Sequence, residues 1–380
     1  MPFVLPPAAR PGQSAAEIDT PSLVLDLDVL EANLDRMQAA ASAAGVHLRP
    51  HAKAHKCPDI ALAQIARGAV GVCCQKVSEA VPFVAAGVTD IHISNEVAGP
   101  AKAAMLAQLA RSARLSVCVD DATQVAALAA ACAEADSRLD VFVEIDVGQN
   151  RCGVADAPSA LRLVEQIARY GRLRFRGLQA YHGGIQHVRD WHERRASAAQ
   201  AARRTAAVVA HLRAAGVTCE VVTGGGSGSV EFDLASGVYT EIQPGSYVFM
   251  DGDYGANAYT GTLRFGHGLF IATAVMSVAA RDRVVVDAGL KSMAVDSGLP
   301  WVWDEAAGAP SRTLEYVAAN DEHGIVKPTG TAHALPVLGA RLRLVPGHCD
   351  PTLNLYDEIV CIRGDTVAAI WPVAARGLSR

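Results

Sequence analysis

The feature that most constrains the fold of this chain is a regular alternation of short β-branched runs with alanine-rich helical runs. The alternation begins at Pro21 and continues to about Met250. It is typical of parallel βα units, in which each strand is followed by a helix. The candidate strands are Leu23–Leu25, Val46–Pro50, Val70–Cys74, Ile91–Ser94, Leu115–Val119, Val141–Val147, Phe175–Tyr181 and Glu220–Thr223. Eight units predict an α/β fold with a (β/α)8 TIM barrel over residues 21–255.

The first helix can be traced in detail. Asp28 is a candidate N-cap with Glu31 three residues on, and Gly45 is a candidate stop. Apolar residues recur between them at helical spacing, at Leu30, Leu34, Met37 and Ala41.

After Tyr254 the pattern changes to β-branched runs separated by glycine and proline, without long alanine-rich helices. This predicts a second, mostly antiparallel β domain over residues 256–380, with residues 1–20 packing on it. Its candidate strands are Leu269–Ala274, Arg283–Asp287, Leu342–Pro346 and Glu358–Arg363. A length of 380 residues, 51% of them apolar, suits one large domain and one smaller one.

The net charge and the cysteine content indicate which classes of partner and which cellular compartment to expect. The formal net charge is -5, and no block of like charge provides a basic stripe for nucleic acid or a polybasic patch for a membrane. We therefore expect a small-molecule partner. The nine cysteines are scattered in apolar runs, which indicates reduced thiols and a cytoplasmic protein. No signal peptide and no apolar run of 18 residues is found, so no transmembrane segment is expected.

The end of the second strand carries the first candidate for chemistry. Reactive residues of βα barrels lie at the carboxyl ends of strands. Here Arg49, His51 and Lys53 alternate, which predicts that they share one face, with Lys53 at the barrel mouth. Basic neighbours depress the pKa of a lysine, as an amine that attacks an aldehyde requires. The alternative is an ordinary solvated basic loop.

Two glycine-rich segments are candidates for anion binding. The eighth strand leads into Thr223–Ser229 and a short helical stretch at Glu231–Ala235, and a second glycine site follows at Pro244–Tyr247. Successive glycines let backbone N–H groups converge on a phosphate. Ordinary turns are the alternative.

Further polar residues follow strands six and seven. Strand six leads through Glu144 to Arg151, and strand seven ends at Tyr181 and His182, with His187 beyond. Arg151 could instead form a surface ion pair, and Tyr181 could be a core aromatic. Convergence of several polar strand ends on one mouth favours a functional site.

The second domain contains a candidate metal pair. His348 and Asp350 lie two residues apart, on one side of an extended segment, while Cys349 between them is expected to point away. A pair of one nitrogen and one oxygen ligand is typical of sites for Mn, Co or Mg, whereas zinc cages are often rich in thiolates. A purely structural pair is the alternative.

These motifs together resemble the fold-type III pyridoxal-phosphate family, in the branch that contains D-threonine aldolase and D-serine dehydratase. The resemblance runs from Asp19 to Gly377. Its most specific segments are 50–56, 73–76, 181–183, 223–229, 287–291 and 348–350.

The resemblance implies a role for each matching position. Lys53 would form the Schiff base with pyridoxal phosphate, and His187 would act as the base. The cofactor-binding set would be Lys53, Gln75, Arg151, Tyr181, His182, Thr223, Gly225, Gly226, Gln243, Gly245, Ser246 and Tyr247. His348 and Asp350 would bind a divalent metal, with Mn2+ favoured over Co2+ and Mg2+. A homodimer is also implied.

At two positions this chain differs from other branches of the family. Alanine racemases have arginine where this chain has Gln243, and D-serine dehydratases have cysteine where it has Asp350. The resemblance thus implies a metal-activated aldolase, which cleaves D-β-hydroxy-α-amino acids to glycine and an aldehyde. A D-serine or 3-hydroxy-D-aspartate dehydratase is the alternative within the fold. A non-catalytic pyridoxal-phosphate carrier would lack the second domain.

Overall fold

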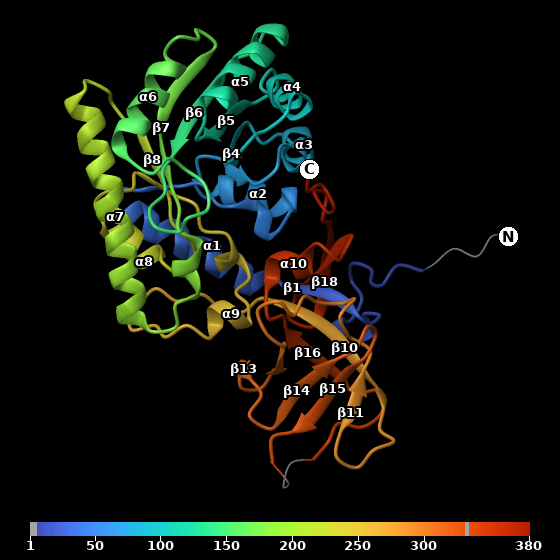
Figure 1. Cartoon of the computed structure of the whole chain (residues 1–380). Helices are drawn as coiled ribbons and strands as arrows, with labels where there is room; N and C mark the ends of the chain where they lie inside the picture. Colours follow the sequence, from blue (N-terminus) through green and yellow to red (C-terminus); the bar gives the residue numbers. More distant parts are fainter. Residues whose placement is uncertain (1–5, 331–333) are drawn as a thin grey trace, which may run out of the picture. The chain divides into compact units, whose positions relative to one another are not determined.

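The computed structural model describes residues 6–330 and 334–380. The chain divides into two compact units (Figure 1). The barrel unit comprises Asp35–Gly245, Asn257–Arg264 and Gly377–Arg380. The β unit comprises the chain up to Leu34, Ser246–Ala256 and Phe265–Arg376.

Within its described residues, the barrel unit is built on eight parallel strands in the order β2-β9-β8-β7-β6-β5-β4-β3. They are β2 (His47–Leu48), β3 (Val72–Cys74), β4 (Asp90–Glu96), β5 (Arg114–Val119), β6 (Leu139–Glu144), β7 (Leu173–Ala180), β8 (Val221–Gly224) and β9 (Glu241–Ile242). The first and last strands of this order meet, because Val70 N–H donates to Leu48 O (2.9 Å) and Cys73 N–H to Pro50 O (2.8 Å). The predicted barrel is confirmed.

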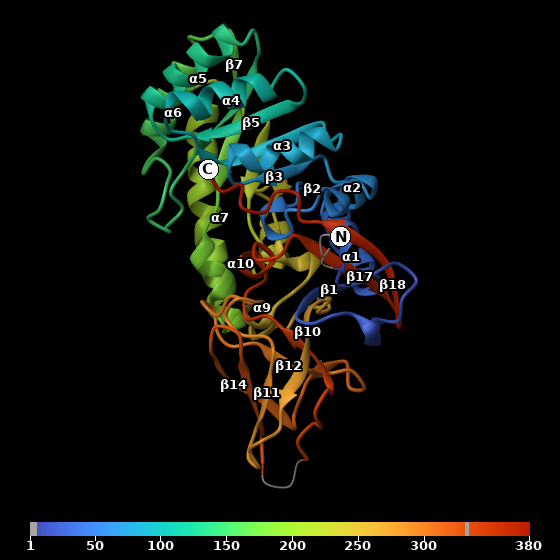
Figure 2. The ribbon, with the colours of Figure 1, turned by 90° about the vertical axis from the view of Figure 1, so that its right-hand side faces the viewer.

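Helices cover the outer side of these strands (Figures 1 and 2). They are α2 (Pro58–Ala66), α3 (Val77–Ala85), α4 (Pro100–Leu109), α5 (Ala122–Glu134), α6 (Ala157–Ile167), α7 (Trp191–Ala214) and α8 (Val230–Ala235). In α5, Asp121 and Gln124 form a capping box at the start. The buried side chains of α5 recur at helical spacing, at Val125, Leu128, Ala129 and Cys132, so one stripe packs inward.

One predicted barrel strand was wrong. Segment β1 (Ser22–Asp26) pairs antiparallel with β10 (Leu269–Ser277) and parallel with β17 (Glu358–Arg363), both in the β unit. Ser22–Leu25 of β1 are all buried, so the apolar pattern of the strand does not reveal which sheet it joins. The remaining barrel strand is β9, which was missed because only two residues pair.

The first helix, α1 (Leu27–Ala43), also differs from the prediction at its start. Asp26, not Asp28, is the capping residue, because its Oδ1 accepts the N–H groups of Asp28 (2.9 Å) and Val29 (3.1 Å). Gly45 follows the helix with φ of 67°, as a stop requires. The unit boundary falls within α1, whereas the sequence placed the domain boundaries at 21 and 255.

In its described residues, the β unit holds a ten-stranded, mostly antiparallel sheet. Besides β1, β10 and β17, its strands are β11 (Val284–Val286), β12 (Trp301–Asp304), β13 (Ala309–Pro310), β14 (Leu314–Ala319), β15 (Gly324–Pro328), β16 (Arg341–Val345) and β18 (Thr366–Pro372). Two short helices are α9 (Gly252–Gly255) and α10 (Cys349–Leu353). Ala9 and Ile18 belong to the same buried cluster as Val24, Val360 and Val367, which fixes the N-terminal segment to this sheet.

All nine cysteines lie in the described residues and are free thiols. In the part of the chain that the structure covers, no helix has the length and apolar character needed to cross a membrane.

Candidate active site

Lys53 lies in a tight turn at the mouth of the barrel. Strand β2 ends at Leu48, and Ala52–Ala54 form the 3-10 turn η2. The prediction that Arg49, His51 and Lys53 share one strand face is therefore wrong. The Lys53 N–H donates to His51 Nδ1 (3.3 Å). His51 Nε2 must therefore carry the proton, and it lies 2.8 Å from Ser94 Oγ and 3.1 Å from Gln75 Oε1. These contacts orient the backbone of the half-buried Lys53.

Arg49 has a structural place in the barrel wall. Its Nη1 is 2.6 Å from Asp90 Oδ1, and its Nε is 3.0 Å from Glu241 Oε1. The three side chains are largely buried, so the two carboxylates, and not water, neutralise the positive charge of the guanidinium. The predicted role of Arg49 as a basic neighbour of Lys53 is therefore not supported.

The glycine loop Thr223–Ser229 is held by residues that the sequence did not single out. Ser229 Oγ donates to Asp233 Oδ2 (2.6 Å), and Gly228 N–H donates to Gln186 Oε1 (2.8 Å). Gly225 has φ of +72°, and a Cβ there would lie 2.5 Å from Asp233 Oδ2. Burial raises the pKa of Asp233 to about 7.

Gln243 is buried and hydrogen-bonded within the barrel. Its Nε2 donates to Gln179 Oε1 and to Thr223 Oγ1, both at 2.8 Å. Gly245 also belongs to the barrel unit, and a Cβ there would lie 3.2 Å from His51 O, so a small residue lets this segment approach the Lys53 turn. The neutral amide and the glycine thus both shape the barrel mouth.

Ser246 and Tyr247 fall in the β unit, in the turn η4 (Ser246–Val248). Ser246 Oγ donates to Asp350 Oδ1 (3.4 Å), and the fully buried Tyr247 packs edge-on against Phe265, with ring centroids 5.6 Å apart. Ser246 is thus a neighbour of a predicted metal ligand.

Arg151, Tyr181 and His182 form one face of the barrel mouth. The Arg151 guanidinium lies 5.3 Å from the centroid of the Tyr181 ring and 3.7 Å from Glu144 Oε1. His182 Nδ1 is buried and has no hydrogen-bond partner among the described residues. Burial lowers the pKa of His182, so the ring is neutral at pH 7. His187 is exposed at the end of the turn η3 (Gly183–His187).

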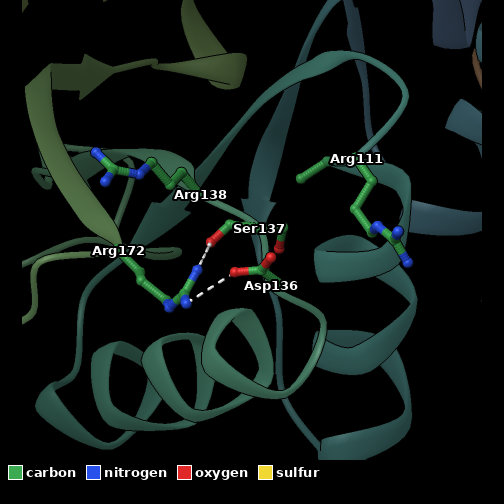
Figure 3. Close-up of a pocket in the computed structure, with 6 residues that line it drawn as sticks. Arg111, Asp136, Ser137, Arg138 and Arg172 are labelled. Atoms are coloured by element: carbon green, nitrogen blue, oxygen red, sulfur yellow. Dashed lines mark hydrogen bonds and ion pairs between the residues drawn. The ribbon is translucent and has the colours of Figure 1, made fainter.

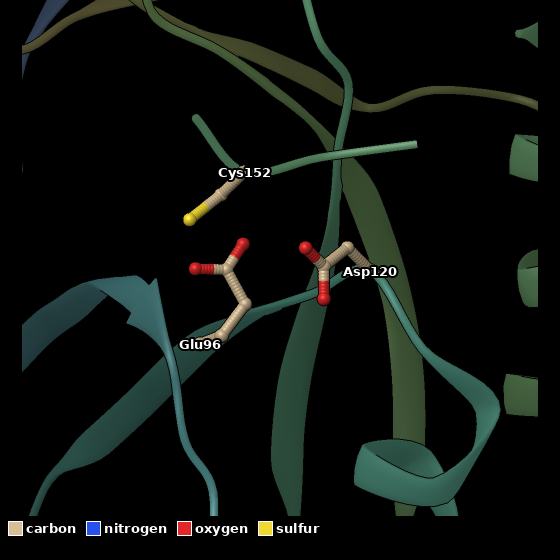
Figure 4. Close-up of side chains that lie close together, drawn as sticks. All are labelled: Glu96, Asp120 and Cys152. Atoms are coloured by element: carbon tan, nitrogen blue, oxygen red, sulfur yellow. The ribbon is translucent and has the colours of Figure 1, made fainter. Parts of the chain in front are cut away.

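An acidic cluster lies at the carboxyl ends of β4 and β5, where the carboxyl groups of Glu96 and Asp120 face the Cys152 thiol (Figure 4). These atoms lie within 4.8 Å of one another, close enough to share a metal ion. Burial and the Glu96 charge raise the pKa of Cys152 to about 11, so without a bound cation the thiol keeps its proton. Burial and Glu96 likewise raise the pKa of Glu144, to about 8. The cluster thus combines two carboxyl groups with a thiol that keeps its proton.

The predicted metal pair lies at the start of α10 in the β unit. His348 is the N-cap residue, and Asp350 is in the first turn. His348 Nδ1 lies 2.8 Å from Asp296 Oδ2, so the ring donates there and its Nε2 is the nitrogen left for a metal. Cys349 is buried and its N–H donates to Asp251 Oδ2 (2.8 Å). Its thiol donates to Asp350 Oδ1 (3.4 Å), so Cys349 does not point away from the pair as predicted. Asp296, which the sequence analysis missed, fits the role of an orienting carboxylate.

The barrel unit also has a hollow of about 630 Å³ at the amino-terminal ends of its strands (Figure 3). It is lined by Arg111, Arg138 and Arg172, and Arg172 pairs with Asp136 (2.9 Å). Catalytic groups of βα barrels lie at the other end of the strands. This hollow is therefore not the candidate active site.

The described residues fit pyridoxal phosphate in the barrel unit. Lys53 is a half-buried lysine that would react with the aldehyde, and the partnerless His182 Nδ1 and the Arg151 guanidinium offer polar contacts to a bound ring. In the β unit, the imidazole and carboxylate of His348 and Asp350 fit a borderline or hard divalent ion.

Comparison with known proteins places the chain in a family. The model of the alanine racemase N-terminal domain matches residues 25–253, and that of the serine dehydratase domain matches residues 268–362. The chain therefore belongs to the alanine racemase-like barrel family, whose fold-type III aldolases use pyridoxal phosphate.

Particular relatives are similar over the whole length. The D-threonine aldolase of Arthrobacter sp is 56% identical over 378 residues, which cover 100% of this chain and 98% of the relative. The 3-hydroxy-D-aspartate aldolase of Paracoccus denitrificans (strain Pd 1222) is 43% identical, over 97% of this chain and 95% of the relative. The crystal structure of D-threonine aldolase from Filomicrobium marinum superposes with a TM-score of 0.94 at 48% identity, and covers 98% of this chain and 100% of that one.

Proposed function

We propose that this chain is a metal-activated, pyridoxal-phosphate-dependent lyase that cleaves D-threonine and other D-β-hydroxy-α-amino acids to glycine and an aldehyde. The observation that carries the proposal is the full-length similarity to D-threonine aldolase in a chain that also has a lysine turn at its barrel mouth. The Asp350 carboxylate, in the place where dehydratases of the D-serine type present cysteine, favours the aldolase over the dehydratase.

Residues of the barrel unit would hold the cofactor. Lys53 supplies the amine for its aldehyde, and the His51 contacts to Ser94 and Gln75 fix the turn that carries this amine. Arg151 would donate to the phenolic oxygen, while the neutral His182 would contact the ring. When bound, pyridoxal phosphate supplies an electron sink for the carbanion left by Cα–Cβ cleavage.

The phosphate would be held by the glycine segments, through Thr223, Gly225, Gly226 and Gly245, with Ser246 and Tyr247 from the adjoining turn.

His348 and Asp350 would hold the divalent cation, and Asp296 would keep the imidazole in the tautomer that presents Nε2. When bound, the cation supplies Lewis-acid polarisation of the β-hydroxyl oxygen, and Mn2+ is the ion that we propose. His187 is exposed, so it can accept the hydroxyl proton from a substrate. We also propose a cytoplasmic homodimer.

The test is to load the purified protein with pyridoxal phosphate and Mn2+ and to measure glycine release from D-threonine and from L-threonine. Release from D-threonine alone is expected. Release of glycine from neither isomer, by protein that shows the bound-cofactor absorbance, would refute the proposed activity.

A further inference from the structure

Gln186, which takes no part in the proposed reaction, connects the turn that ends in His187 to the glycine loop by hydrogen bonds. Its side chain is only 2% exposed. Its Oε1 accepts the N–H groups of Gly228 (2.8 Å) and Ser229 (3.2 Å), and its Nε2 donates to Ser229 Oγ (2.8 Å). One buried amide therefore makes three hydrogen bonds to two successive loop residues.

The same residue explains why the loop has glycine at two positions. A Cβ at Gly226 would lie 2.6 Å from Gln186 Oε1, and a Cβ at Gly228 would lie 2.5 Å from the Gln186 carbonyl oxygen. Real Cβ atoms do not approach so closely. The loop can thus pack on Gln186 only because it lacks side chains at these positions.

The backbone of Gln186 is fixed from the other side. Its carbonyl oxygen accepts from Asn257 Nδ2 (2.9 Å), and Asn257 Oδ1 accepts from Arg189 Nη1 (2.8 Å). The fully buried Arg194 donates to Val188 O (2.5 Å), directly after His187. The turn and its neighbours therefore form one connected set of hydrogen bonds.

We propose that Gln186 is a positioning residue, which holds the glycine loop in the shape that receives the cofactor's phosphate and joins that loop to the turn carrying His187. The inference rests on the proposed function, because it takes the loop to be a phosphate site.

The hydrogen bonds specify an amide at position 186. The Ser229 hydroxyl donates its hydrogen bond to Asp233, so Ser229 Oγ accepts a hydrogen bond from Gln186 Nε2, while Gln186 Oε1 accepts from backbone N–H groups. An ionised glutamate in this place has no proton to donate, and it adds a buried negative charge beside a loop that receives a phosphate.

The experiment compares two ligands of the apoprotein, pyridoxal phosphate and pyridoxal. Both present an aldehyde to Lys53, so the ratio of their dissociation constants isolates recognition of the phosphate. In Gln186→Met, which keeps the length of the side chain without its hydrogen bonds, we expect the preference for the phosphorylated ligand to fall by about tenfold. In Gln186→Glu the fall should be larger at high pH, where the carboxyl is ionised and charge repulsion is added. Pyridoxal affinity should stay near the wild-type value.

Gln64→Glu is the matched control, since Gln64 is also 2% exposed but lies in α2, and it should keep the wild-type ratio. Circular dichroism identifies the variants that fold. A folded Gln186→Met protein with the wild-type ratio would overturn the role of Gln186 and leave the proposed function standing. A wild-type protein without preference for the phosphorylated ligand would instead defeat the assignment of the loop, and the cofactor assignment with it.

Discussion

The buried carboxyl of Asp233 should make the stability of the barrel unit depend on pH. Asp233 is 5% exposed, and burial raises its pKa from 3.8 to about 7. A carboxyl whose folded-state pKa is raised stabilises the fold fully below the unfolded value, and this contribution is lost as pH rises through the folded value. Between about pH 5.5 and 8.5, Asp233 alone should therefore lower the free energy of unfolding by about 2 kcal/mol.

The perturbation is Asp233→Asn, which removes the titration but keeps an oxygen that can accept from Ser229 Oγ. Urea unfolding of the apoprotein, followed by circular dichroism at the two pH values, gives the free energies. The variant should be more stable relative to wild type at pH 8.5 than at pH 5.5, by about the same 2 kcal/mol.

Asp136→Asn is the control for this experiment. Asp136 has a side chain that is 86% exposed and a φ of 49°, which asparagine tolerates, so the substitution should leave the pH dependence unchanged. An identical pH dependence in wild type and Asp233→Asn would refute the reasoning from burial.

Three further outcomes are expected. Lys53→Ala should abolish the absorbance of lysine-linked cofactor, and retention of that absorbance would contradict the role of Lys53. Asp350→Ala should raise the Mn2+ concentration needed for half-maximal activity by about tenfold or more while the cofactor stays bound, and an unchanged metal titration would remove Asp350 from the metal site. Glu241→Gln should lower the free energy of unfolding by about 3 kcal/mol, because it leaves the Arg49 charge buried with one partner fewer. Urea unfolding measures this loss, and a loss below about 1 kcal/mol would show that the pair behaves as an exposed one.

The sequence predicts the parts of the fold that depend on local pattern. The strands from β3 to β8 were found because β-branched runs alternate with amphipathic helices. β1 was assigned to the wrong sheet, since an apolar run records burial and not the identity of the neighbouring strands. β9 was missed because a two-residue pairing has no periodicity.

The residues of the candidate site also fall into two groups, those that a local motif indicates and those that it does not. Lys53 and the pair His348 and Asp350 stand in compact motifs that the sequence displays. Gln186 and Asp296 act through partners that are 42 and 52 positions away in the chain, so no local pattern indicates them. Contacts of this kind depend on how the chain folds back on itself.

The most direct test of the account is a product balance for D-threonine. The cofactor-loaded protein is incubated with Mn2+, with and without chelator, and glycine, acetaldehyde and ammonia are assayed together. The account predicts equimolar glycine and acetaldehyde, both lost when the chelator is present. Ammonia with a keto acid and no glycine would contradict it and assign the chain to dehydratase chemistry.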